Sequence, residues 1–103
     1  MKLKKFKYKI VNNTNNVAIR LIKNFNINQG IVIADNQKDG KGQYGKKWLS
    51  YYGNIFVSIF FSLDKINLSI TQITKMNCLN VKKLLSFYYK KKITIKDPND
   101  LLI

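Results

Sequence analysis

Histidine and glutamate are absent from this 103-residue sequence, and cysteine, proline and tryptophan each occur once. Because there is no imidazole and Cys78 is the only thiol, the chain has almost no side chains with which to hold a transition metal. Ser–His and Cys–His catalytic pairs are excluded within the chain for the same reason. A single cysteine also excludes an intrachain disulfide and is typical of a reducing compartment, so we expect a cytoplasmic protein.

Long apolar runs are also missing. The first ten residues are basic, but no apolar stretch of the kind found in signal peptides follows them. Nowhere are there enough consecutive apolar residues to span a bilayer. We therefore expect neither a secretion signal nor attachment to a membrane.

Acidic residues are scarce, since 5 Asp and Glu stand against 19 Lys and Arg and leave a net charge of +14. Such an excess attracts polyanions, among them nucleic acids, nucleotides and acidic membrane surfaces. The basic residues are almost all lysine, and asparagine, isoleucine and tyrosine are abundant, which is also typical of drift towards one class of codons. Composition alone leaves both interpretations open.

The first third of the chain predicts a strand, a helix and a second strand. Apolar residues alternate with lysines over residues 3–10, which is typical of an edge strand. We expect Asn13 or Thr14 to cap the helix, because apolar residues then recur at helical spacing: Val17, Ala18, Leu21, Ile22 and Phe25. After a turn at residues 28–30, residues 31–34 predict the second strand.

The remainder predicts a strand, a long helix and a further strand. Residues 55–61 are apolar at both alternate positions, which predicts a central strand covered on both faces. A connector over residues 63–67 leads to Ser69, the expected cap of an amphipathic helix whose apolar stripe comprises Ile70, Ile73, Val81, Leu84 and Tyr88. Residues 93–95 predict another strand, and residues 101–103 look like the start of one more. This order predicts one small α+β domain, a β-sheet with flanking helices.

Residues 37–48 form a loop rich in glycine and lysine that ends in the only tryptophan. We expect its glycines (Gly40, Gly42 and Gly45) to let the backbone turn through positive φ and offer bare N–H groups to an anion. Four lysines add positive charge, and an indole offers a flat face: Lys38, Lys41, Lys46, Lys47 and Trp48. A dinucleotide fingerprint and a P-loop both require a helix directly after the loop, and the sequence predicts a strand there. The loop therefore suits a ligand with a phosphate and a planar base, the alternative being a solvated hairpin loop.

Four motifs follow one another along the chain: Asn13-Thr14-Asn15; Gln37 with Gly40-Lys41-Gly42, Gly45-Lys46 and Trp48; Gly53-Asn54-Ile55-Phe56-Val57-Ser58; and Lys96 with Pro98-Asn99-Asp100-Leu101. In this order they resemble the catalytic domain of biotin–protein ligases. Together they cover nearly the whole chain and are far more specific than any one of them. Lipoate–protein ligases are similar in fold and logic, but a loop of glycine and arginine that ends in tryptophan is the form of the biotin branch.

The resemblance implies a class II synthetase-like domain with a mixed β-sheet and flanking helices. Residues 1–103 would be its N-terminal part, with neither a DNA-binding helix-turn-helix domain nor a C-terminal domain, so DNA binding is not expected. The family joins biotin to ATP, accompanied by Mg²⁺, to make biotinyl-adenylate and pyrophosphate. Biotin then passes to a lysine of a partner, the biotin carboxyl carrier protein domain of acetyl-CoA carboxylase.

Carried over position by position, the resemblance assigns biotin contacts to Asn13, Thr14, Asn15, Gln37, Gly40, Lys41, Gly42 and Gln43. It assigns nucleotide contacts to Lys41, Gln43, Trp48, Lys96, Asn99 and Asp100, and it assigns no metal ligand. Lys41 is the expected catalytic residue, because a cation on this loop can stabilise negative charge on the transferring phosphoryl group. The tryptophan can hold a ring against its flat face.

The chain departs from the family pattern at four positions. Asn13 replaces a serine, Lys41 and Gln43 replace arginines, and Asp97 replaces a tryptophan. Lysine keeps the charge of arginine but loses its bidentate fork. The sequence also ends before the glycine-rich segment that carries the family's essential lysine.

Two alternatives to an active ligase follow. The first is an inactive, shortened fragment of the ligase domain. The second is a nucleic-acid-binding module, which the net charge favours together with aromatic residues among lysines, as in single-strand binders: Tyr44, Trp48, Tyr51 and Tyr52.

Overall fold

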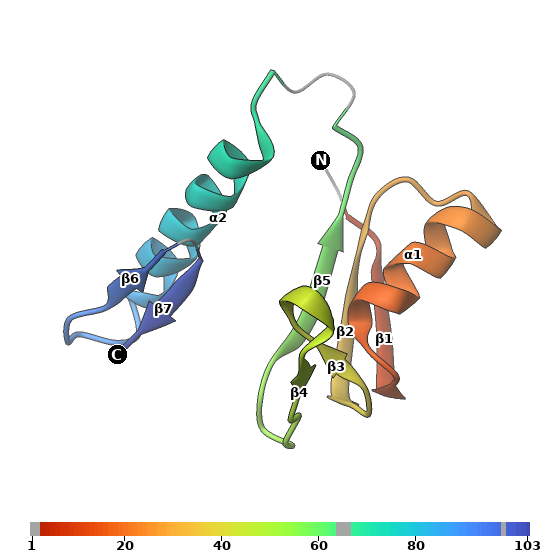
Figure 1. Ribbon diagram of the computed structural model, residues 1–103, viewed down its shortest axis with the longest axis horizontal. Helices are drawn as coiled ribbons and strands as arrows, with labels where there is room; N and C mark the ends of the chain where they lie inside the picture. Colours follow the sequence, from red (N-terminus) through yellow and green to blue (C-terminus); the bar gives the residue numbers. More distant parts are fainter. Residues whose placement is uncertain (1–2, 64–66, 98) are drawn as a thin grey trace. The chain divides into compact units, whose positions relative to one another are not determined.

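A three-stranded mixed sheet with one helix packed on it forms the first part of the computed structural model (Figure 1). The structure describes residues 3–63, 67–97 and 99–103, and the chain divides into two compact units, residues 1–64 and 65–103. In the first unit, β1 (Lys5–Val11) runs parallel to β2 (Gly30–Gln37), with Lys5 opposite Ile31. β5 (Phe56–Phe60) runs antiparallel to β2 on its other side, with Ile31 opposite Ile59. Parallel neighbours need a crossover connection, and the helix α1 (Thr14–Phe25) supplies it.

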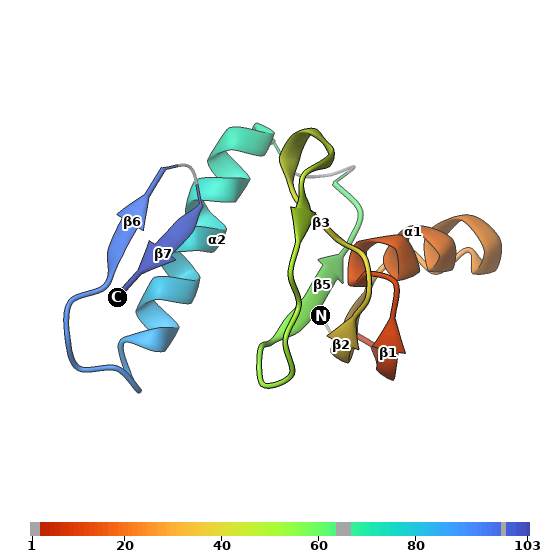
Figure 2. The ribbon, with the colours of Figure 1, turned by 60° about the horizontal axis from the view of Figure 1, so that its bottom comes forward.

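The glycine-rich segment between β2 and β5 forms a small hairpin (Figure 2). Its strands are β3 (Gly40–Lys41) and β4 (Lys47–Trp48), which pair antiparallel, and the short 3₁₀ turn η1 (Gln43–Gly45) joins them. The N–H of Gly42 donates to the carbonyl of Lys46 at 2.6 Å, which closes the hairpin. The predicted loop is therefore a defined hairpin rather than an open turn.

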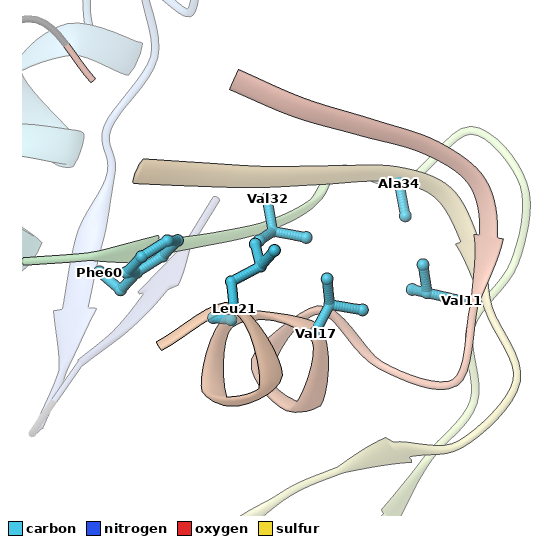
Figure 3. Packing of buried hydrophobic residues seen from close by; sticks show 7 residues of the cluster. Val11, Val17, Leu21, Val32, Ala34 and Phe60 are labelled. Atoms are coloured by element: carbon cyan, nitrogen blue, oxygen red, sulfur yellow. The ribbon is translucent and has the colours of Figure 1, made fainter. Parts of the chain in front are cut away.

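The core of the first unit lies between α1 and one face of the sheet. Figure 3 shows Val17 and Leu21 of α1 directed towards Val32 and Ala34 of β2. Val32 is fully buried, and Phe60 of β5 closes one end of the cluster. The predicted helix is thus confirmed, with N-cap Asn13. Of its predicted apolar positions, Val17, Ala18 and Leu21 are buried, whereas Ile22 and Phe25 are exposed. The helix ends at Phe25, and its C-cap Asn26 adopts a left-handed conformation with φ 52°.

The prediction of a central strand at residues 55–61 is wrong for the described residues. β5 lies at the end of the three-stranded sheet, and β2 has partners on both sides. Ser58 and Phe60 face α1, whereas Val57 and Ile59 lie on the other face, 40% and 57% exposed. A run that is apolar at both alternate positions does not specify its neighbours, because pairing depends on register with strands far away in the sequence. β1 does lie at an edge of this sheet, as predicted.

The second unit contains the helix α2 (Ile70–Leu85) and an antiparallel pair, β6 (Thr94–Lys96) and β7 (Asp100–Leu102). Ser69 caps α2 in a capping box with Gln72, as the sequence predicts in part: the Ser69 hydroxyl accepts the Gln72 N–H, and the Gln72 side chain accepts the Ser69 N–H. The strands predicted at residues 93–95 and 101–103 form with shifts of one residue. Of the predicted connector at residues 63–67, residues 64–66 lie outside the described part of the chain.

The apolar stripe predicted for α2 is mostly exposed. Ile70 and Leu84 are 76% and 57% exposed, whereas Cys78 is buried. Cys78 lines a cavity with residues of β7 and of the turn before it, so this narrower face is the one that packs. A hairpin of two three-residue strands covers only part of a helix of sixteen residues. The predicted α+β class, with a mixed sheet and flanking helices, is confirmed.

Among the described residues, the helices are too short or too polar to cross a bilayer.

Candidate ligand-binding site at the start of helix α1

A cavity of about 470 Å³ opens in the first unit where α1 begins. The first turn of α1, the end of β2, the β3–β4 hairpin and the start of β5 contribute to its wall. The lining residues are Asn13, Thr14, Asn15, Asn16, Ile19, Gln37, Lys41, Gly42, Ile55, Phe56, Val57 and Ser58. One part of the wall is therefore made of amides and hydroxyls, and another of apolar side chains. Such a mixed wall suits a ring compound with a few polar groups.

Asn13 ties the start of α1 to the segment that leads into the hairpin. Its side-chain oxygen accepts the Asn16 N–H at 2.8 Å, and its amide nitrogen donates to the Asp39 carbonyl at 2.9 Å. Two backbone bonds strengthen this connection, from the Lys38 N–H to Val11 and from the Asp39 N–H to Asn12. Asn13 is buried and lines the cavity, but both polar atoms of its side chain already serve the cap and this connection.

Thr14, Asn15 and Ser58 form a hydrogen-bonded group in the cavity wall. The hydroxyl oxygens of Thr14 and Ser58 are 2.7 Å apart, and the Ser58 hydroxyl donates to the side-chain oxygen of Asn15 at 2.5 Å. The Thr14 N–H donates to the side-chain oxygen of Gln37 at 3.3 Å. Thr14 and Ser58 are buried, so this group is held in place before any ligand arrives.

The cavity is electropositive on two sides. The N-terminal end of α1 carries the positive end of the helix dipole, while the Thr14 and Asn16 N–H groups of its first turn already donate to Gln37 and Asn13. Lys41 reaches the wall from β3, where its ammonium lies 3.7 Å from the Asp39 carboxylate. This ion pair is partly exposed, so water screens it and it contributes little to stability. The lysine therefore adds a cation to a wall otherwise made of neutral polar and apolar groups.

The expectation that Gly40, Gly42 and Gly45 all turn through positive φ is wrong for two of them. Only Gly45 does so, with φ 73°, next to Tyr44 with φ 58°. At Gly42 an added Cβ would fall on the Trp48 indole, 2.8 Å from its Cδ1. At Gly40 it would lie 2.7 Å from Nε2 of Gln37. At Gly42 the indole ring therefore occupies the space of a side chain, whereas at Gly40 the nearest atom is the end of the Gln37 side chain, which can move. The Gly42 N–H is used inside the hairpin rather than offered to an anion.

Trp48 lies beside Gly42 with a largely exposed indole, 64% accessible to water. Three tyrosines of the same region are exposed as well: Tyr44, Tyr51 and Tyr52. Trp48 does not line the cavity itself, although its packing on Gly42 positions a residue that does.

Most of the predicted biotin contacts meet at this cavity, namely Asn13, Thr14, Asn15, Gln37, Lys41 and Gly42. Gly40 is buried next to Gln37, just outside the lining. The side chain of Gln43 lies outside what the structure describes.

The predicted nucleotide contacts Lys96, Asn99 and Asp100 belong to the second unit. There, Lys96 pairs with Asp100 across β6 and β7. Asn99 lines a cavity of about 340 Å³ with Cys78. Pro98 of the same motif lies outside the described residues. Their role in binding stays a prediction.

Six lining residues were not assigned to the site from the sequence: Asn16, Ile19, Ile55, Phe56, Val57 and Ser58. Ser58 had one local signal, because it is the polar residue within the apolar run 55–61. Ile55, Phe56, Val57 and Ser58 also belong to the third of the four motifs, from which no site residue was assigned. Asn16 and Ile19 look like ordinary helix positions.

The sequence matches the model of the biotin/lipoate A/B protein ligase family over residues 8–103. The fold also matches biotin protein ligase from Aquifex aeolicus in complex with biotin and ATP. That match has a TM-score of 0.82 at 25% sequence identity and covers 97% of this chain and 41% of that one.

Two further solved structures share the fold. The biotin acetyl coenzyme A carboxylase synthetase from Helicobacter pylori, with bound biotinylated ATP, matches with a TM-score of 0.80 at 19% identity, covering 99% of this chain and 50% of that one. Biotin protein ligase from Leishmania major, in complex with biotinyl-5-AMP, matches with a TM-score of 0.73 at 18% identity, covering 99% and 48%. The chain thus spans between 41% and 50% of the length of these proteins.

Proposed function

The chain belongs to the biotin/lipoate A/B protein ligase family, and we propose from this membership that its cavity binds biotin and, with ATP, forms biotinyl-adenylate and pyrophosphate. The observation that carries the proposal is the group of Thr14, Asn15 and Ser58 in the wall of a cavity that Lys41 also lines. Residues 1–103 correspond in this proposal to the N-terminal part of the catalytic domain.

The polar and the apolar parts of the cavity wall suit two different parts of biotin, its urea ring and its aliphatic chain. Fixed hydroxyl and amide groups can pair with the N–H and C=O groups of a cyclic urea, while Ile19 and Phe56 can contact the aliphatic part. In this proposal Lys41, which lines the cavity, stabilises the negative charge that develops around the α-phosphate when the biotin carboxylate attacks ATP. As an ammonium, it does so as a point charge, without the two-pronged geometry of a guanidinium.

Nucleotide contacts are proposed for Lys41, Gln43, Trp48, Lys96, Asn99 and Asp100. The exposed indole offers a flat face on which an adenine ring can stack. Mg²⁺ would come with ATP, held mainly by its phosphates and by water. Among the described residues, no three carboxylate, imidazole or thiol groups gather to hold an ion.

The acceptor of biotin in this proposal is a lysine of the biotin carboxyl carrier protein domain of acetyl-CoA carboxylase. The lone cysteine supports a reducing compartment, and we propose the cytoplasm as the site of the reaction.

Chemical protection of lysines tests the ligand-binding claim. A non-hydrolysable biotinyl-adenylate mimic should protect Lys41 and Lys46 from acylation, measured by mass spectrometry of peptides. Biotin alone should protect them less, because it lacks the phosphate that the cations attract. Lys7 and Lys9 on β1 serve as controls, since both are exposed and neither lines the cavity. Equal labelling of Lys41 with and without the mimic would remove the claim.

A second candidate function is binding of single-stranded nucleic acid. The exposed aromatic side chains around the hairpin favour it, together with the net charge of +14. In that case Trp48→Ala should weaken oligonucleotide binding, the affinity should fall steeply with salt, and biotin should leave binding unchanged. Competition by the adenylate mimic would instead favour the ligase.

A further inference from the structure

A buried serine stands on the face of β5 that packs against α1. Along this face Ser58 lies between Phe56 and Phe60, and its side chain is 8% exposed. A buried hydroxyl is costly unless it is hydrogen-bonded. Ser58 meets this requirement through Thr14 and Asn15, both in the first turn of α1, and all three residues line the cavity.

The hydrogen atoms of this group follow from the orientation of the Asn15 amide, whose oxygen faces Ser58. The oxygen of an asparagine side chain can only accept, so the single hydroxyl hydrogen of Ser58 goes to Asn15. The 2.7 Å contact between Thr14 and Ser58 must then use the hydroxyl hydrogen of Thr14. The Thr14 oxygen keeps only lone pairs for any further partner.

We propose that Ser58 is a positioning residue that makes Thr14 a hydrogen-bond acceptor towards the cavity, so that the site selects a ring with an N–H donor. This inference rests on the proposed function and deepens it, because it concerns which ring the same cavity takes. A cyclic urea carries N–H groups that Thr14 can accept. A dithiolane ring carries none, and a carbonyl oxygen in that place would face another acceptor. A buried polar group left without its partner disfavours the wrong ligand strongly.

The position of the Ser58 hydroxyl argues for a role in ligand selection rather than in stability alone. Phe56 and Phe60 show that this face of β5 is otherwise apolar, so an alanine at position 58 would fit the core without a polar partner. The hydroxyl instead connects two residues at the start of α1 that are next to each other in the cavity wall. Removing it would free the hydroxyl hydrogen of Thr14, which could then point into the cavity.

Calorimetric titration of the chain with biotin and with biotin methylated on its urea nitrogens tests the inference. The measured quantity is the dissociation constant of methylated biotin divided by that of biotin. Methylation removes the N–H donor, so this ratio reports how strongly the site prefers a ring that carries one. The ratio should fall several-fold, and at most about tenfold, in Ser58→Ala, because the Thr14 hydroxyl is then free to turn its hydrogen towards the cavity. Ser58→Thr keeps a hydroxyl and should restore the ratio. Ser62→Ala, at an exposed position beyond the end of β5, is the matched control.

A ratio that stays unchanged in Ser58→Ala overturns the inference. Failure of the wild type to bind biotin would reject the proposed function, and the inference with it.

Discussion

Gly42 and Gly45, two of the three glycines before Trp48, lack a side chain for different physical reasons. Gly42 has an ordinary backbone conformation, but the indole of Trp48 occupies the space of a side chain. Gly45 has open space around it and a φ of 73°. Packing across the hairpin therefore favours glycine at position 42, whereas the positive φ favours it at position 45.

Alanine substitutions should separate these two causes. Gly42→Ala is expected to displace the indole and shift the fluorescence of Trp48, the only tryptophan, and to weaken binding of the adenylate mimic. Gly45→Ala should lower the free energy of unfolding by about 1 kcal/mol through backbone strain, without a comparable shift in emission. The interpretation is contradicted if both variants shift the emission equally.

Lys41 is the residue on which the proposed chemistry depends most. Lys41→Ala should weaken binding of the biotinyl-adenylate mimic about tenfold, at the lower end for a charged hydrogen bond because water screens a half-exposed ammonium. Binding of biotin alone should change much less. Lys41→Arg should bind the mimic at least as well as the wild type, because it restores a bidentate donor. Lys7→Ala is the charge-matched control, and an equal loss there would show that only net charge matters.

At the scale of elements, the start of α1 joins three parts of the site. Asn13 caps the helix and holds the Asp39 carbonyl, so the same side chain orients the first turn and the entry to the hairpin. The cap could be predicted from residues 12–16, because an N-cap bond spans only three residues. The bond to Asp39 spans 26 residues and depends on where β2 ends.

Substitutions at Asn13 should distinguish its role as helix cap from its hydrogen bond to Asp39. Asn13→Ala should lower the free energy of unfolding by about 1–2 kcal/mol, since both the cap and the bond to Asp39 are lost. Asn13→Ser keeps a capping oxygen but has no amide to reach Asp39. It should therefore recover most of the stability, while amide exchange in residues 38–42 becomes faster than in the wild type. Exchange in that segment as slow as in the wild type would contradict the role of the amide.

On the scale of the whole molecule, apolar side chains are exposed in both units. On the sheet face away from α1, Val57 and Ile59 stand opposite Ile33 and Ile31 and form one apolar strip. In the second unit, Ile70 and Leu84 of α2 are exposed as well. Exposed apolar surface of this kind favours association.

The chain alone is therefore expected to self-associate. Size-exclusion chromatography with light scattering should show oligomers that grow with concentration, and thermal unfolding should be broad. Ile59→Lys should raise the monomer fraction, because it places a charge in the strip. Ile22→Lys, on the exposed side of α1, should have a smaller effect. A monomer with a steep, cooperative transition at high concentration would refute this expectation.

The sequence by itself determined the parts that depend on near neighbours. Helix caps at Asn13 and Ser69, the helical period of Val17 and Leu21, and the order of strands and helices follow from bonds and contacts a few residues apart. The glycine–lysine segment and the four motifs likewise indicated the family that the match over residues 8–103 shows.

Tertiary structure decided what depends on partners far away in the chain. Ser58 reaches Thr14 across 44 residues, so its role depends on the register of β5 against β2 and on the packing of α1 on the sheet. The position of β5 at the edge of the sheet and the exposure of the apolar stripe of α2 likewise depend on which elements lie beside them. Periodicity reports which positions are apolar, but only the relative placement of neighbouring elements decides which of those positions are covered.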